Sequence, residues 1–394
     1  MNKFVFAFDV EGPIVNPSFD FSWLTLENLV KSDDLENMSE KVKIFDEYDD
    51  NRWLRERGME GHSTGTTPIV TSLLAVAYGA KNDDFLDLAN RHLKLTPGAN
   101  QLIRWLKDEK RIEPYFISSA NPAAILPVAY KLGILSSHVF CSGYQLNTAM
   151  AERYDKLRTE RPDIHEEIMR KELGERFPYD KYSNSESLQH FLARFLDFCV
   201  EMNKSYASGR TDEEIVRSSR DKQLKLLEET RQEIGTLADD LRYLLYSEDG
   251  VMGGHRKKRA LMLIEKLEKT KKEKLVYSGD SIVDADAIAF AGHGISINCT
   301  NRHALISSKI NVATPTLESL IPIIEHIASG GELTVELRDI MQDKLNESVN
   351  PRIEAIPPTQ IFTKNEIDGR IETVTQANRL CKEYIKKVKS DTIF

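Results

Sequence analysis

The sequence predicts an α/β fold built on a doubly wound parallel sheet, and three observations predict it. Short apolar segments of strand length alternate along the chain with longer helical segments, which favours parallel strands joined by helical crossovers. The first segment, residues 4–8, has five apolar residues in a row, three of them Phe, as in a central strand covered on both faces. Two long helical stretches interrupt the alternation, so we expect a helical cap at 14–94 and a second, mainly helical insertion at 147–250.

Composition limits the class of protein. The 394 residues allow two to three domain-sized units, and 41% hydrophobic with 29% charged residues is typical of a soluble globular chain. The net charge of −9 argues against broad nucleic-acid binding. No apolar stretch is long enough to span a membrane, and the N-terminal one is too short for a signal peptide. The four cysteines form no CxxC pair, so we expect reduced thiols and a cytoplasmic location.

The cap is expected to be helical throughout most of its length. Leu35, Met38, Val42 and Phe45 recur at helical intervals, and the stretches 68–78 and 83–93 predict two more helices. A cap of this kind would close over a site on the sheet and select the substrate.

The core is expected to comprise residues 1–13, 95–146 and 251–330. Thr96 is a good helix N-cap and Pro97 suits a first helical turn, which predicts a helix over 96–106. The later core elements follow in sequence order: strand 115–117, helix 122–132, strand 138–144, helix 256–267, strand 275–280, strand 294–298 and a last strand at 311–313. Residues 331–394 are expected to be a charged helical tail.

The second insertion contains two helical patterns. One stripe comprises Leu188, Phe191, Leu192, Phe195, Cys199 and Met202. Leu227, Ile234 and Leu241 repeat every seven residues, with Leu237 and Leu244 at complementary positions, as in a helical hairpin or short coiled coil. Such a hairpin either packs on itself or provides a homodimer or partner contact.

Polar residues follow three of the predicted strands. The first strand delivers Asp9 and Glu11, which share a face because they are two residues apart. The second delivers Ser118 and Ser119, and the strand at 275–280 delivers Asp280 followed by Asp284. Open α/β sheets bind ligands at the carboxyl ends of their strands.

A basic run, Arg256-Lys257-Lys258-Arg259, begins the helix before that last strand. Carboxylates, a hydroxyl and a lysine together suit phosphoryl transfer, because oxygen ligands hold Mg²⁺ while lysine and serine bind phosphoryl oxygens.

The arrangement resembles the haloacid dehalogenase (HAD) superfamily of phosphohydrolases. Its four signatures appear in order as DVEG at 9–12, ISSAN at 117–121, a lysine near 257 and GDSIVD at 279–284. The stretches LTPGA at 95–99 and AGHGISIN at 291–298 are similar to the phosphoserine phosphatase branch. DVEGP, followed by two large insertions, also resembles an archaeal group of hydrogenase-associated, phosphatase-like proteins.

The resemblance implies a role for each motif residue. Asp9 would be the nucleophile that forms an aspartyl-phosphate, and Glu11 the acid and base for the leaving group and water. Ser118 would bind phosphate, with Ser119 as the alternative hydroxyl, and Lys257 would contact the phosphate, with Lys258 as the alternative. Mg²⁺ would be bound by Asp9, Asp280, Asp284 and Glu11, the last through its main-chain carbonyl. Most family members have Asp at the position of Glu11.

The resemblance therefore implies a Mg²⁺-dependent phosphatase of a small phosphorylated, phosphoserine-like metabolite. The alternatives are a phosphotransferase of the same fold and a non-catalytic subunit that uses the 147–250 helices to bind a partner.

Overall fold

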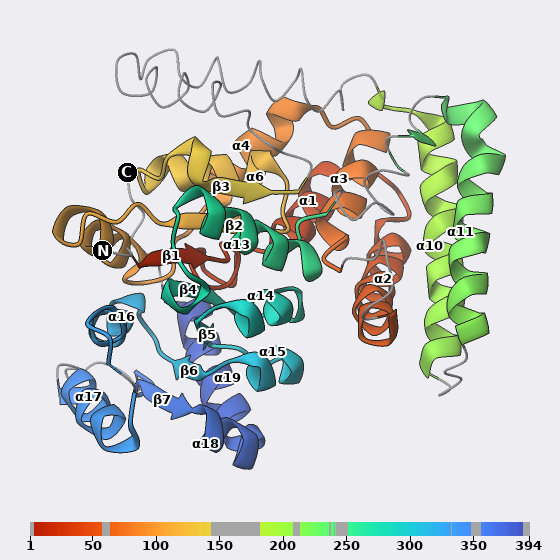
Figure 1. Cartoon of the computed structure of the whole chain (residues 1–394). Coiled ribbons are helices and arrows are strands. Elements are labelled where there is room, and N and C mark those ends of the chain that lie inside the picture. The colour runs from red at the N-terminus through yellow and green to blue at the C-terminus, as the bar shows by residue number, and fades with distance from the viewer. Residues whose placement is uncertain are drawn as a thin grey trace.

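A seven-stranded sheet forms the centre of the molecule (Figure 1). The computed structural model describes residues 4–56, 64–142, 182–207, 213–235, 238–239, 241, 251–331, 333–347 and 356–388. In spatial order the strands are β3 (Val139–Cys141), β2 (Tyr115–Ser118), β1 (Val5–Phe8), β4 (Leu275–Gly279), β5 (His293–Ile297), β6 (Ile310–Ala313) and β7 (Gln360–Thr363). All neighbours pair in parallel except β6 and β7, so the predicted doubly wound parallel sheet is confirmed.

Strand β1 is an interior strand between β2 and β4, and every one of its residues is apolar and buried. Phe6 and Phe8 point into one hydrophobic cluster, and Val5 and Ala7 into the other, as the two-residue period of a strand requires. The chain runs from β1 outward to β3 and then returns to β4 on the other side of β1. The carboxyl ends of β1 and β4 therefore flank the point where the strand order reverses.

Helices cover both faces of the sheet. One face is covered by α5 (Ala99–Arg104), α6 (Pro122–Lys131) and α16 (Leu320–Ala328). The other is covered by α13 (His255–Leu267), α14 (Ala285–Phe290) and α15 (Arg302–Ser307). None of the helices in the described ranges is long and apolar enough to cross a membrane.

Residues 14–94 form four helices, and three of them match the predicted helical stretches, while the first was not predicted. They are α1 (Phe21–Leu29), α2 (Leu35–Glu56), α3 (Thr67–Ala77) and α4 (Asn82–His92). We refer to them as the cap.

The second insertion contributes α10 (Glu186–Ala207) and α11 (Glu213–Ile234), which stand beside α2 at the right of Figure 1. All six residues of the predicted stripe are buried. The stripe packs on α2 as well as on α11: Phe195 lies 5.6 Å from Phe45 between ring centroids, and Lys41 pairs with Asp197 at 2.6 Å. The hairpin thus braces the cap. The predicted heptad positions Leu237 and Leu244 lie outside the described residues.

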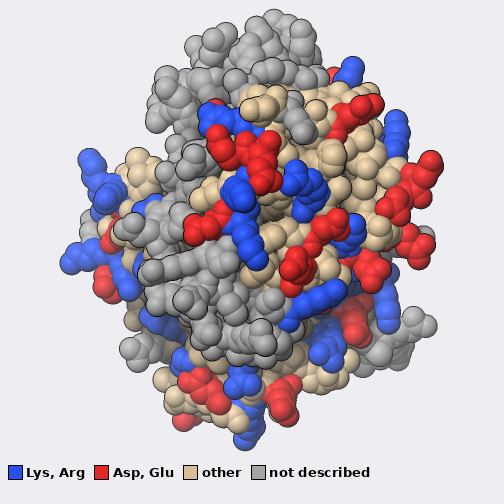
Figure 2. Space-filling view, turned by 90° about the vertical axis from the view of Figure 1, so that its right-hand side faces the viewer, with Lys and Arg blue, Asp and Glu red and all other residues tan. Residues whose placement is uncertain are grey.

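Seen from that side, acidic and basic side chains are interspersed over the described residues (Figure 2). This is the pattern of a solvent-exposed surface, whereas a nucleic-acid-binding face gathers Lys and Arg.

The tail at 331–394 contains helices, as predicted, and also a strand that was not predicted. Residues 360–363 form β7, which extends the sheet beyond β6 in antiparallel pairing. The chain on either side of it forms α17 (Val335–Glu347), α18 (Lys364–Gly369) and α19 (Ile371–Lys387). Gln-Ile-Phe-Thr is too short to show strand alternation in a charged segment, and its pairing partner lies about fifty residues earlier in the sequence.

The helix predicted over 96–106 begins later than expected. Gly98 has a φ of +78°, and α5 starts at Ala99. An added Cβ at Gly98 would lie 2.6 Å from the Glu318 amide nitrogen, so Thr96 to Gly98 form a turn packed against the 316–318 backbone.

Candidate active site

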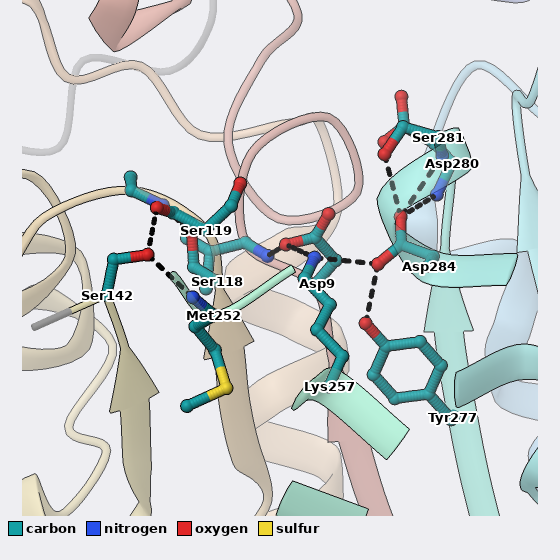
Figure 3. A network of polar contacts seen from close by, with 12 residues as sticks. Asp9, Ser118, Ser119, Ser142, Met252, Lys257, Tyr277, Asp280, Ser281 and Asp284 are labelled. Atoms are coloured by element: carbon teal, nitrogen blue, oxygen red, sulfur yellow. Dashed lines mark hydrogen bonds and ion pairs between the residues drawn. The ribbon is translucent and has the colours of Figure 1, made fainter. Parts of the chain in front are cut away.

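Three carboxylates meet at the carboxyl ends of β1 and β4 (Figure 3). Asp9 directly follows β1, and its amide donates to the Ser278 carbonyl of β4 at 2.8 Å. Asp280 directly follows β4, and Asp284 closes the short turn Ile282–Asp284. One oxygen from each of the three lies within 4.8 Å of the others, and all three residues are buried.

Lys257 joins two of these carboxylates. It projects from the first turn of α13, is fully buried, and places Nζ 2.9 Å from Asp9 Oδ1 and 2.7 Å from Asp284 Oδ1. Burial alone would lower the pKa of Lys257, but the Asp284 and Asp9 carboxylates raise it above its ordinary value, so the ammonium stays charged. Lys258, the alternative from the sequence, lies 6.0 Å from the Phe290 ring instead.

Asp284 is held by many donors. Its Oδ1 accepts from Lys257 and from the Tyr277 hydroxyl at 2.6 Å, and its Oδ2 accepts from the amides of Asp280 and Ser281, each at 3.1 Å. Burial would raise the pKa of Asp284, but Lys257 and these hydrogen bonds lower it below its ordinary value. These contacts favour the ionised form of Asp284, which orients Lys257 and the turn after β4.

Asp9 differs from Asp284 in its environment. Burial and the neighbouring Asp284 charge raise its pKa well above the ordinary value, and Lys257 opposes them. Its Oδ1 also accepts from the Val10 amide at 2.8 Å. The carboxylate thus has one oxygen fixed by two donors in a site with excess negative charge.

Asp280 is packed against the turn after β1. A Cβ on Gly12, whose φ is +95°, would lie 2.5 Å from the Asp280 carboxylate, so only glycine fits there. Asp280 Oδ2 accepts from Lys382 of α19 at 2.7 Å. Burial raises the pKa of Asp280, and Lys382 counteracts this shift.

Glu11 lines the same cavity as Asp9 and Asp280, just before the chain enters the cap. Its Oε1 accepts from the Phe21 amide, the first residue of α1, at 3.1 Å. Burial, followed by the nearby Asp20 charge, raises the pKa of Glu11 to about 8. A carboxyl group with this pKa carries a proton at neutral pH and can donate it.

The two serines after β2 occupy different positions. Ser118 is fully buried, and its hydroxyl accepts from the Ala120 amide at 3.2 Å. Ser119 lines the cavity described next, and its carbonyl accepts from Ser142. The accessible hydroxyl is therefore that of Ser119, whereas the sequence favoured Ser118.

A cavity of about 350 Å³ adjoins these residues. The core contributes Asp9, Glu11, Ser119 and Asp280 to its wall, the cap contributes Asp20, Trp23, Asp46, Asp50 and Thr67, and α19 contributes Lys382 and Lys386. Lys257 lies behind this wall, buried between its two carboxylates.

A cap loop, Thr64 to Thr67, lies against the core beside the cavity. Buried Asp49 holds it by accepting from the Gly65 amide at 2.8 Å and the Thr66 amide at 3.0 Å. A Cβ on Gly65 would meet Ser119 and Val283 at 3.1 Å, so the loop and the core are in close contact.

The structure brings together Asp9, Glu11, Lys257, Asp280 and Asp284, and it places Ser118 and Ser119 at the same sheet edge. Sequence reasoning missed Tyr277, the cap acids and Lys382. Tyr277 lies within an apolar strand, so its sequence pattern predicts a core residue. Lys382 is 102 residues away from Asp280, the carboxylate it contacts. The one available signal for Lys382 is the amphipathic period of α19, whose buried residues recur three or four apart.

Comparison with known proteins supports the fold. No protein-family model matches the chain, and no curated protein does. The structure of gene product AF1437 from Archaeoglobus fulgidus is similar, with a TM-score of 0.61, 18% sequence identity and 99% of each chain covered.

Two phosphoserine phosphatase structures also match. The apo form has a TM-score of 0.41 and 11% identity, over 81% of this chain and 98% of that one. The phospho-aspartyl intermediate analogue has a TM-score of 0.42 and 12% sequence identity, over 82% of this chain and 99% of that one. At 18% identity the first likeness concerns the fold alone, and the other two are too distant to argue from.

Proposed function

We propose that the chain is a Mg²⁺-dependent phosphohydrolase of the haloacid dehalogenase type, acting on a small phosphomonoester through an aspartyl-phosphate at Asp9. The observation that carries the proposal is the position of Asp9. It stands at the reversal point of the sheet, in the wall of an open cavity, held by a buried lysine and close to two further carboxylates.

The carboxylates suit a magnesium ion. Asp9, Asp280 and Asp284 supply three negative charges against Lys257 and Lys382, and oxygen is the ligand that Mg²⁺ prefers. Both Asp284 oxygens already accept hydrogen bonds, so Asp9 and Asp280 would hold the ion directly, with the main-chain carbonyl of Glu11. When bound, Mg²⁺ would neutralise charge on the phosphoryl oxygens.

Asp9 would act as the nucleophile. Its Oδ1 accepts from Val10 and Lys257, and these two contacts hold the carboxylate in the cavity wall. An Asp9–phosphorus bond forms as the bond from phosphorus to the leaving oxygen breaks, giving an aspartyl-phosphate and an alcohol.

Glu11 would handle both protons. Its raised pKa of about 8 keeps it protonated to donate to the leaving oxygen. The resulting carboxylate then accepts a proton from water, whose oxygen attacks phosphorus and releases Asp9 and inorganic phosphate.

The substrate is a small phosphorylated metabolite under this proposal. The cavity volume lies at the lower end of the range for small-ligand sites, and the cap supplies much of its wall. A phosphoserine-like compound is the first candidate, because the sequence motifs resemble that branch.

A phosphatase assay with an aryl phosphate and Mg²⁺ tests the proposal, followed by a panel of phosphorylated metabolites. We expect turnover that Asp9→Asn lowers by at least about 10³-fold, while Asp33→Asn, at an exposed acid outside the cavity lining, leaves it unchanged. An inactive wild type across the panel would contradict the proposal. Product that accumulates only with an added acceptor alcohol would indicate a phosphotransferase.

A further inference from the structure

Helix α19 is fixed to the core close to the site. Its buried face includes Val374, Cys381 and Ile385. Near its middle, Asn378 Nδ2 donates to the Cys299 carbonyl at 2.7 Å and to Asn311 Oδ1 at 3.1 Å. Near its end, Asn16 Nδ2 donates to the Ile385 carbonyl at 2.9 Å. The helix is thereby tied both to the sheet and to the chain that follows β1.

This anchoring places Lys382 inside the cavity wall. Its Nζ lies 2.7 Å from Asp280 Oδ2, and its side chain is 27% exposed, whereas that of Lys257 is 0% exposed. Lys257 donates to Asp9 and Asp284 from behind the cavity wall, where it has no exposed surface. Lys382 has three ammonium donors and one carboxylate partner among the described residues, so donors remain for a ligand.

A phosphate group that approaches Asp9 enters a cavity with more carboxyl groups than lysines. Asp9, Glu11, Asp20, Asp46, Asp50 and Asp280 all line the cavity, while the basic residues among the described lining are Lys382 and Lys386. Of these two, Lys382 is the one in contact with the carboxylates at the strand ends.

We propose that Lys382 of the C-terminal helix is a phosphate-binding residue of the site, on the cavity side of the carboxylates, while Lys257 holds Asp9 and Asp284 from the buried side. The inference deepens the function proposed above and rests on it. A charge-assisted hydrogen bond from Lys382 would help to offset the repulsion between the phosphate and the acids of the cavity.

Calorimetric titration of inorganic phosphate into the full-length protein with saturating Mg²⁺ tests this role. We expect Lys382→Met to weaken phosphate binding by about tenfold or more, and Lys382→Arg to stay within about threefold of wild type. Lys387→Met is the matched control, because Lys387 is an exposed lysine of the same helix outside the cavity lining, and it should bind as wild type does. If Lys382→Met does not fold, Lys382→Gln provides the same comparison.

A parallel titration of Mg²⁺ without phosphate separates direct contact from an effect through Asp280. The inference predicts that Lys382→Met does not weaken Mg²⁺ binding. Unchanged phosphate affinity in this variant would overturn the inference, as would an equal loss of Mg²⁺ and phosphate affinity. A wild type that binds no phosphate would overturn the proposed function itself, and the inference with it.

Discussion

At the scale of single residues, the site is a set of buried charges that compensate one another. Lys257 has no contact with solvent and satisfies two carboxylates that burial would otherwise destabilise. Removing one partner from such a set leaves uncompensated charges in a medium that solvates them poorly. The lysine therefore contributes to folding as well as to the orientation of Asp9.

Lys257→Met tests this contribution. We expect the free energy of unfolding to fall by about 3–5 kcal/mol, because Asp9 and Asp284 both lose their cation. Lys258→Met is the control: that lysine is partly exposed against the Phe290 ring, and its loss should cost less than about 1 kcal/mol. Urea unfolding of both variants measures the difference, and equal losses would show that the buried ion pairs are not what stabilises the site.

Sequence patterns predicted single positions for the acids of the site, whereas they left two adjacent candidates for its lysine. Asp9 and Asp280 each end an apolar strand, so the rule for open α/β sheets brings them together. Lys257 and Lys258 are adjacent in a basic run, and only the phase of α13, which buries Ala260, Leu261 and Ile264, decides between them. Ser118 and Ser119 posed the same problem, because which hydroxyl reaches a cavity depends on how the cap covers the strand end.

At the scale of elements, α2 shapes the cap side of the cavity. Asp46 and Asp50 line the cavity one helical turn apart, and Asp49 turns away to hold the 64–67 loop. Burial raises the pKa of Asp50 to about 8 and that of Asp46 to about 6, and their mutual repulsion adds to the shift of Asp50.

Asp50→Asn should stabilise the protein in a pH-dependent way. The folded-state pKa of Asp50 lies above its unfolded value, so its contribution to stability is present at low pH and is lost as pH rises toward about 8. The variant should therefore raise Tm relative to wild type more at about pH 8.5 than at about pH 5. Thermal unfolding at both pH values, with exposed Asp33→Asn as the control, provides the measurement; an equal shift at both would contradict the raised pKa.

Asp49→Ala should release the loop at 64–67. It removes the acceptor of the Gly65 and Thr66 amides and of nearby threonine hydroxyls, which we expect to cost about 2–4 kcal/mol. Asp49→Asn keeps one acceptor oxygen and should cost less. Urea unfolding together with hydrogen exchange at Gly65 measures both effects, and unchanged protection of that amide in Asp49→Ala would refute the role of Asp49.

At the scale of the whole molecule, segments far apart in the sequence complete one sheet and one site. The alternation of short apolar segments with helical segments predicted the parallel core, even though the cap separates β1 from β2 and the second insertion separates β3 from β4. It missed β7 and the position of α19, because β7 pairs with a strand about fifty residues earlier and α19 packs on residues far away in the sequence. Lys382 of α19 lies 102 residues from Asp280 in the sequence.

The α10–α11 hairpin bears on the oligomeric state. The sequence left open whether these helices pack within the chain or form a homodimer contact. In the structure the apolar stripe of α10 is buried against α2 and α11 of the same chain. We therefore expect the 44.9 kDa chain to be a monomer by light scattering in solution. A dimer that becomes a monomer when exposed residues of α11 such as Lys222 or Lys225 are replaced by glutamate would instead place the interface on the outer side of the hairpin.

The proposed reaction passes through a covalent phosphoryl group on Asp9, and chemical trapping of that intermediate is its most direct test. The protein would be quenched during turnover of an aryl phosphate with Mg²⁺, reduced with borohydride and sequenced by mass spectrometry. An aspartyl-phosphate is reduced to homoserine, so we predict homoserine at position 9 in wild type and none when substrate is omitted. Steady turnover with unmodified Asp9, or with homoserine at another acid, would contradict the account.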